Sequence, residues 1–219
     1  MSDDHSMDDR SERSALLSAL TTEHFVLQTA NNSTYAEASA RSTLYVMVLS
    51  STLVAIGFVA GSTDVLIPFA AIVLPAVFVL GIFTVIRLVE TALDSMHCLD
   101  GIARIRAYYR TLGSEAAHHF SPESGRWPEV EDPALRFGAG LAFFGTTACM
   151  IAVINNAVAG VALALLVRFL RPSAPTWVDV SAGIVGALVL TWLFYVYQRW
   201  RFNDYEVRIR QRGQGQPPY

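Results

Sequence analysis

The sequence predicts an all-α, polytopic integral membrane protein: a bundle of four membrane-spanning helices with long cytoplasmic helical extensions. Four runs carry no charged residue, and each is long enough for a helix to cross about 30 Å of hydrocarbon, which takes about 20 residues. They are residues 42–63, 65–86, 137–167 and 180–198. Charged residues are only 16% of the 219, against about 25% in ordinary soluble domains, whereas hydrophobic residues are 53%. We therefore expect a lipid bilayer to cover the apolar surface.

The N-terminal segment divides into a tail and an entrance helix. Residues 1–20 are acidic and polar, with too little apolar surface to fold, and we predict a disordered tail there. Thr21 or Thr22 can cap a helix that meets no Pro or Gly before Gly57. We therefore expect this amphipathic helix to enter the first span, at about 42–63, without a break.

The second span, at about 65–87, is predicted to continue as a cytoplasmic helix over 88–112 and to stop at Gly113. Its apolar residues recur in steps of three and four, as one face of a helix requires. They are Val89, Leu93, Met96, Leu99, Ile102, Ile105 and Tyr109. This face needs a partner, and the N-terminal helix of the same chain is the nearest candidate, followed by helices of other subunits.

The second half, 135–200, is predicted to hold spans three and four. Residues 113–134 are rich in Pro, Gly and His and are predicted to form a cytoplasmic loop. The third run, 137–167, would measure about 46 Å as one helix, so we expect it to overhang the bilayer or to break near Asn155. The fourth span is expected at about 178–198, and residues 201–219 form a basic and then disordered tail.

The arginines predict the orientation. All sixteen basic residues are Arg, and fourteen of them lie before the first run, between the second and third, or after the fourth. Only Arg168 and Arg171 lie on the other side. Short loops rich in basic residues stay in the cytoplasm, so both termini are predicted to be cytoplasmic. With no cleavable signal sequence apparent, we expect a multi-pass protein of the plasma (inner) membrane. Residues 23–61 resemble the beginning of bacterial four-span proteins, a resemblance that implies no mechanism.

Two amides inside the third run are the candidate polar intramembrane site. Asn155 and Asn156 could line a water-filled path or coordinate an ion through their carbonyl oxygens. The alternative is that they make the interhelical hydrogen bonds that are common in membranes and average about 0.6 kcal/mol. The second reading is favoured, because no Asp, Glu or His lies within the four runs. A proton-coupled transporter is disfavoured for the same reason.

Three further features accompany the spans. Arg87 and Glu90, one turn apart at the end of the second span, could form a charged cytoplasmic mouth of a pore or simply extend to the interface. Pro68 and Pro75 could kink the same span and open a cavity behind it, or could be packing features. Gly57 and Gly61, in GFVAG, predict close helix packing.

No segment of the sequence contains a motif that indicates a particular activity. Phosphate-binding loops, nucleophile elbows, zinc-protease helices and dinucleotide fingerprints do not occur, so we predict that the protein is not an enzyme. We expect no metal or cofactor, and no nucleic-acid partner, because the basic residues lie beside the membrane. The favoured function is an oligomeric channel or pore with a cytoplasmic helical stalk. The alternative is a membrane-anchored adaptor or regulator that recruits a cytoplasmic protein. A homo-oligomer is predicted, because four short-looped helices leave small-residue faces partly uncovered.

Overall fold

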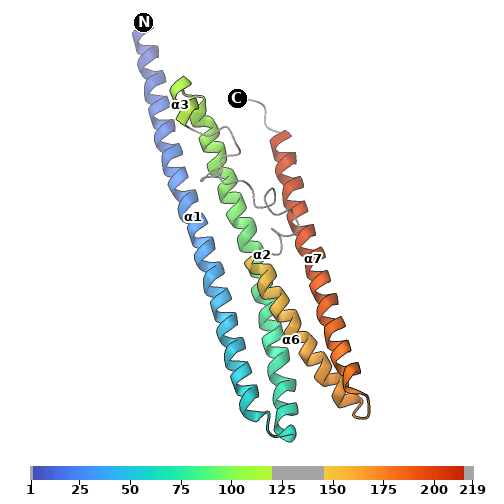
Figure 1. Ribbon diagram of the computed structural model, residues 1–219. Coiled ribbons are helices and arrows are strands. Elements are labelled where there is room, and N and C mark those ends of the chain that lie inside the picture. Colours follow the sequence, from blue (N-terminus) through green and yellow to red (C-terminus); the bar gives the residue numbers. More distant parts are fainter. Residues whose placement is uncertain (1, 120–145, 215–219) are drawn as a thin grey trace. The chain divides into compact units, whose positions relative to one another are not determined.

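The computed structural model describes residues 2–119 and 146–214, which are helical apart from short turns (Figure 1). The helices are α1 (Ser2–Val59), α2 (Thr63–Arg110), α3 (Ser114–His119), α6 (Thr147–Leu170) and α7 (Thr176–Gln214). Within these residues, four helices are long and apolar enough to cross a membrane, namely α1, α2, α6 and α7. The all-α class and the four apolar helices are confirmed, and the chain has the composition of a multi-pass membrane protein.

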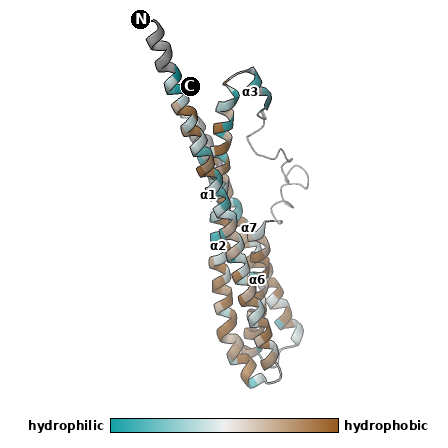
Figure 2. Ribbon diagram, turned by 90° about the vertical axis from the view of Figure 1, so that its left-hand side faces the viewer, coloured by the Kyte–Doolittle hydropathy of each residue, from teal (hydrophilic) through white to brown (hydrophobic). Residues whose placement is uncertain are grey.

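The chain divides into two compact units, and α1 and α2 contribute to both. One unit comprises residues 1–37 and 91–132, and the other comprises residues 38–90 and 133–219. We call the described part of the first (2–37 and 91–119) the polar helix pair, and that of the second (38–90 and 146–214) the apolar bundle. Figure 2 shows the difference in hydropathy: the helices of the apolar bundle are mostly brown, whereas teal residues are frequent in the polar helix pair.

In the polar helix pair, the N-terminal part of α1 packs on the C-terminal part of α2. The Ser95 hydroxyl donates to Asn31 Oδ1 at 2.7 Å, and the hydroxyls of Thr21 and Tyr109 lie 3.3 Å apart. Ile102 and Ile105 are buried on the α2 side. The part of the predicted apolar face that lies in this unit, from Leu93 to Tyr109, thus has the N-terminal helix of the same chain as its partner.

The helix α1 begins at Ser2, whereas the sequence predicts a disordered tail to residue 20. Helix propagation costs little once a turn exists, and no Pro or Gly interrupts the chain before Gly57. Charge alone therefore does not end this helix.

The helix α2 passes through Pro68 and Pro75 without interruption and ends at Arg110, close to the expected stop at Gly113. Proline has no N–H, so each one removes a backbone hydrogen bond, which a membrane helix tolerates where neighbours compensate. The second span and the helix predicted at 88–112 are therefore one continuous helix.

The third apolar run does not break near Asn155. The helix α6 starts at Thr147, has 24 residues and runs through Asn155 to Leu170. The side chain of Thr146 caps it by accepting from the Cys149 N–H at 3.3 Å. At about 36 Å, it needs neither a break nor an extreme tilt. Residues 137–145 of the expected span lie outside the described residues, as does most of the predicted loop 113–134.

The helix α7 continues well past the expected end of the fourth span at 198, as far as Gln214. The segment predicted as a basic tail contains no helix breaker before Gly213, and Asp204 and Arg208 form an i,i+4 ion pair at 2.8 Å. Its first 14 residues, 201–214, are therefore helical.

Candidate functional site

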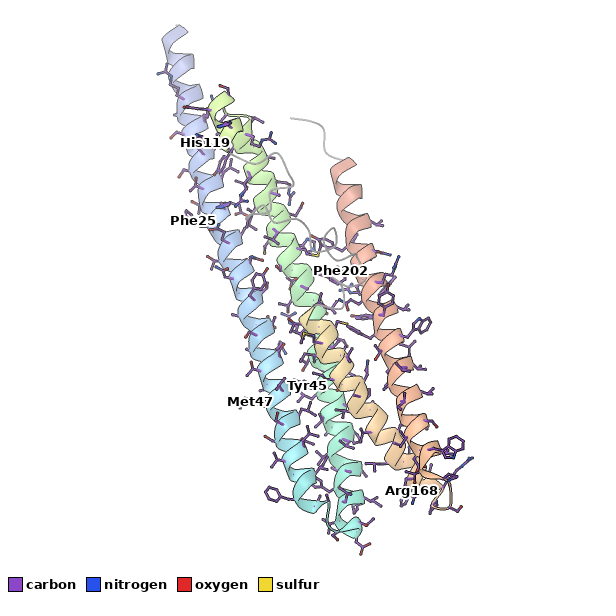
Figure 3. The ribbon with its side chains drawn as sticks, viewed as in Figure 1. Phe25, Tyr45, Met47, His119, Arg168 and Phe202 are labelled. Carbon is purple, nitrogen blue, oxygen red and sulfur yellow. The ribbon has the colours of Figure 1, made fainter. Side chains whose placement is uncertain are left out.

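Asn155 lies at the meeting point of three helices of the apolar bundle. Its Oδ1 accepts a hydrogen bond from the Tyr45 hydroxyl of α1 at 3.1 Å, and its Nδ2 donates to the Phe78 carbonyl of α2 at 3.2 Å. Asn155 and Tyr45 are 2% and 0% exposed. Figure 3 shows Tyr45 directed from α1 toward α2 and α6. One amide thus ties α1, α2 and α6 together about 12 Å from the start of α6.

Gly81 gives this amide its space. A Cβ atom at position 81 would overlap the Asn155 side chain, with Nδ2 only 2.7 Å away. The absence of a side chain therefore lets α6 approach α2 closely enough for Nδ2 to reach the Phe78 carbonyl. No local sequence pattern connects this glycine with Asn155, 74 residues further along the chain.

Asn156 connects α6 to the remaining helix. Its Nδ2 donates to the Thr191 hydroxyl of α7 at 3.2 Å, and this hydroxyl donates to the Ala187 carbonyl at 2.8 Å. Consecutive helical residues point about 100° apart, so the two amides form hydrogen bonds with different neighbouring helices. Together they form a junction that reaches α1, α2 and α7, which we call the amide junction (Tyr45, Gly81, Asn155, Asn156 and Thr191).

Close backbone contact continues the packing between α6 and α7. A Cβ on Gly160 would lie 2.6 Å from the Gly183 carbonyl oxygen, and a Cβ on Gly183 would lie 2.6 Å from that of Gly160. Small residues that let backbones meet are the usual means of association for helices in lipid. The glycines predicted for packing behave differently: at Gly57 and Gly61, no described atom lies within 4 Å of a built Cβ. Packing of those two glycines against another chain stays a prediction.

Arg87 and Glu90 form an ion pair on one turn of α2. Arg87 Nη1 lies 3.3 Å from Glu90 Oε2, and the side chains are 39% and 42% exposed. An i,i+3 pair of this exposure contributes a few tenths of a kcal/mol. Their role at a pore mouth stays a prediction, because nothing in this geometry requires a ring of subunits.

A second charged pair, which sequence analysis does not predict, joins α6 to α7. Arg168 Nη1 lies 3.6 Å from Asp179 Oδ2 and donates to the Ala174 carbonyl at 3.1 Å. The Asp179 side chain is only 7% exposed, and its Oδ1 has no hydrogen-bond partner among the described residues. Arg168 lies where α6 leads into the turn to α7 (Figure 3), so the pair closes this turn. The sequence feature that could have indicated this pair is Asp179 itself, which directly precedes the charge-free run 180–198.

In the polar helix pair, two titratable groups are perturbed. Burial, and secondarily the Arg106 guanidinium, lower the pKa of His24 from its ordinary 6.5, and its Nδ1 is buried without a hydrogen-bond partner in the described part of the chain. Burial and the Asp94 carboxylate raise the pKa of the Cys98 thiol. Within residues 2–119 and 146–214, no group of three or more His, Cys, Asp or Glu side chains is arranged to hold a metal ion.

Comparison with known proteins adds no family: no protein-family model, no curated protein and no solved structure matches the chain. Function must therefore be argued from the geometry of the two units.

Proposed function

We propose that the protein is a membrane-anchored adaptor, in which the apolar bundle is the anchor and the polar helix pair recruits a cytoplasmic protein. The observation that carries the proposal is the exposure of large apolar side chains on α1 in the polar helix pair. Phe25, Val26 and Tyr35 are 62%, 55% and 61% exposed, although they lie before the first charge-free run. Exposed aromatic residues of this kind favour protein interfaces.

Two helices that pack only on one another bury one stripe each. In the polar helix pair, α1 uses Thr21, Leu27 and Asn31 against α2, whereas Phe25 and Tyr35 remain largely exposed. In water, a further helix or a folded partner that covers Phe25 and Tyr35 would gain about 25 cal/mol per Å² of apolar area removed from solvent. We place this surface in the cytoplasm because of the distribution of the arginines.

The oligomeric channel is the other hypothesis, and the amide junction argues against the path proposed for it. Asn155 and Asn156 direct their amides to partners within the chain, at 3.1 to 3.2 Å, and both are buried. Amides that hold helices together in this way have less hydrogen-bonding capacity left for water or ions. A homo-oligomer remains compatible with the adaptor, with Gly57 and Gly61 as its proposed contact, and a detergent or nanodisc size measurement tests it.

The test combines partner capture with conductance. Full-length protein in nanodiscs should retain a specific partner that Phe25→Ser with Tyr35→Ser loses, while Phe83→Ser, on an equally exposed aromatic of the apolar bundle, keeps it. Planar bilayers holding wild type should show no unitary currents. Currents that Asn155→Leu with Asn156→Leu abolishes would establish the channel and overturn the adaptor.

A further inference from the structure

An apolar groove separates α2 from α6 at one end of the apolar bundle. It has a volume of about 730 Å³, within the range of small-molecule sites. Its walls are aliphatic and aromatic, and include both prolines of α2: Ile67, Pro68, Ala70, Ala71, Leu74, Pro75 and Phe78 on α2, and Ala159, Ala162, Leu163, Leu165, Leu166 and Phe169 on α6. A cavity is thus present beside Pro68 and Pro75, as one of the two interpretations of these prolines predicts.

The groove arises because the two helices meet at one point and then diverge. They are closest where Asn155 lies against Gly81 and bonds to the Phe78 carbonyl. From there α6 moves away from α2 toward the turn that leads into α7 (Figure 1). The α6 wall runs from Ala159 to Phe169, about 15 Å along the helix, which is about half the thickness of the hydrocarbon layer. The groove thus has the length of a single leaflet.

Two opposite charges lie on the helices that wall the groove, close to the turns that join α1 to α2 and α6 to α7. Asp64 lies one helical turn before Pro68, on the same face of α2, and Arg171 follows Phe169 by two residues at the end of α6. Both side chains are exposed, and neither has an ion-pair partner among the described residues. The nearby Arg168 is engaged with Asp179 and the Ala174 carbonyl. The free charges are therefore one carboxylate and one guanidinium.

We propose that this groove binds a phospholipid with a primary-amine headgroup. One acyl chain lies between α2 and α6, the phosphate contacts Arg171, and the ammonium contacts Asp64. A guanidinium holds a phosphate through charge-assisted hydrogen bonds, and a carboxylate accepts them from an ammonium. A helix of a second copy could also fill an apolar groove, but it would leave the exposed, opposite charges of Asp64 and Arg171 without a role. This inference does not depend on the adaptor function.

The proposed position of the acyl chain is tested by substitutions that place a larger side chain in the groove, one from each of its two helices. Native mass spectrometry of the full chain in detergent, titrated with palmitoyl-oleoyl phosphatidylethanolamine, should show one saturable adduct. Ala162→Phe on α6 and Ala71→Phe on α2 should each lose it. Val161→Phe and Ile72→Phe are the matched controls, since these neighbours are 54% and 73% exposed and do not line the groove. They should bind like wild type, and all four should retain wild-type helicity.

The proposed headgroup contacts of Asp64 and Arg171 are tested with three lipids that carry the same acyl chains. Wild type should bind phosphatidylethanolamine about tenfold more tightly than phosphatidylglycerol, the difference expected for one charge-assisted contact. Asp64→Asn should remove that preference. Arg171→Gln should weaken both phospholipids to the level of diacylglycerol, whereas Arg208→Gln, on the distant end of α7, should change nothing.

Three results would overturn the proposal. Equal binding by wild type and by both groove-filled variants would place the lipid elsewhere. Equal affinity of wild type for phosphatidylethanolamine and phosphatidylglycerol would remove the role of Asp64. A disulfide-linked dimer of Ala162→Cys, formed in membranes more rapidly than by Val161→Cys, would assign the groove to a second copy.

Discussion

The two units of this chain are held together by different kinds of contact. In the apolar bundle, two buried amides and a glycine connect α6 to three other helices, across sequence separations of 35 to 110 residues. In the polar helix pair, the contact between the Thr21 and Tyr109 hydroxyls is exposed, and the hydrogen bond from Ser95 to Asn31 is partly buried. The hydrogen bond from Tyr45 to Asn155 in the apolar bundle is, in contrast, fully buried. Single substitutions should therefore act more strongly in the apolar bundle.

The largest effect is expected from Gly81→Ala. The added methyl group overlaps the Asn155 side chain, so the amide must shift and lose its contacts. We expect a loss of about 1–3 kcal/mol, typical of overpacking a tight contact, in reversible unfolding in mixed micelles. Gly113→Ala, in the turn after α2, is the control, because no described atom lies within 4 Å of a Cβ built there, and it should be nearly neutral. Equal effects of the two would contradict the close approach at Gly81.

Asn155→Leu should rank next. It removes two interhelical hydrogen bonds and leaves the Tyr45 hydroxyl without its acceptor, which at about 0.6 kcal/mol per bond in lipid predicts a loss of about 1–2 kcal/mol. Asn156→Leu removes one bond and should cost about half as much. A double-mutant cycle with Tyr45→Phe measures the coupling directly, and additive losses would show that the bond to Tyr45 contributes nothing.

The polar helix pair should respond to pH through His24. Its lowered pKa means that protonation is less favourable in the folded pair than in the unfolded chain. The polar helix pair therefore has its full stability above the ordinary pKa of 6.5, where His24 is neutral in both states. Its free energy of unfolding decreases as the pH falls below 6.5, until the pH passes the lowered pKa of the folded state. Hydrogen exchange, corrected for intrinsic rates, should show less protection of the pair at pH 5.5 than at pH 7.5. His24→Gln should remove this difference, and a dependence that persists in it must come from another group.

The smallest effect concerns the two thiols, one in each unit. Cys98 is half-buried and has a raised pKa, so a maleimide should modify it at pH 7 more slowly than it modifies a free thiol. Asp94→Asn removes one of the two causes and should increase the rate modestly. Cys149, 2% exposed in the apolar bundle, should remain unmodified until the protein is denatured. Rapid labelling of Cys149 in intact membranes would contradict the packing of α6.

The sequence predicts the elements better than it predicts their contacts. Charge-free runs reveal the four long apolar helices because their length and composition are local properties. The helical extensions at Ser2 and Gln214 were not predicted, because polarity indicates exposure and does not by itself end a helix. The partners of Asn155 depend on the register of helices 77 and 110 residues away, which no local pattern encodes. Tyr45 was nevertheless a visible clue, as a hydroxyl within an apolar run that needs an acceptor.

The central claim is that the polar helix pair binds a protein partner and the apolar bundle contacts lipid. Site-specific photo-crosslinking in native membranes tests it most directly. A benzophenone amino acid would replace Phe25 in the polar helix pair or Phe83 in the apolar bundle, which are 62% and 67% exposed. The adaptor account predicts a discrete protein adduct at position 25 and only lipid adducts at position 83. Protein adducts at position 83 with none at position 25 would contradict it.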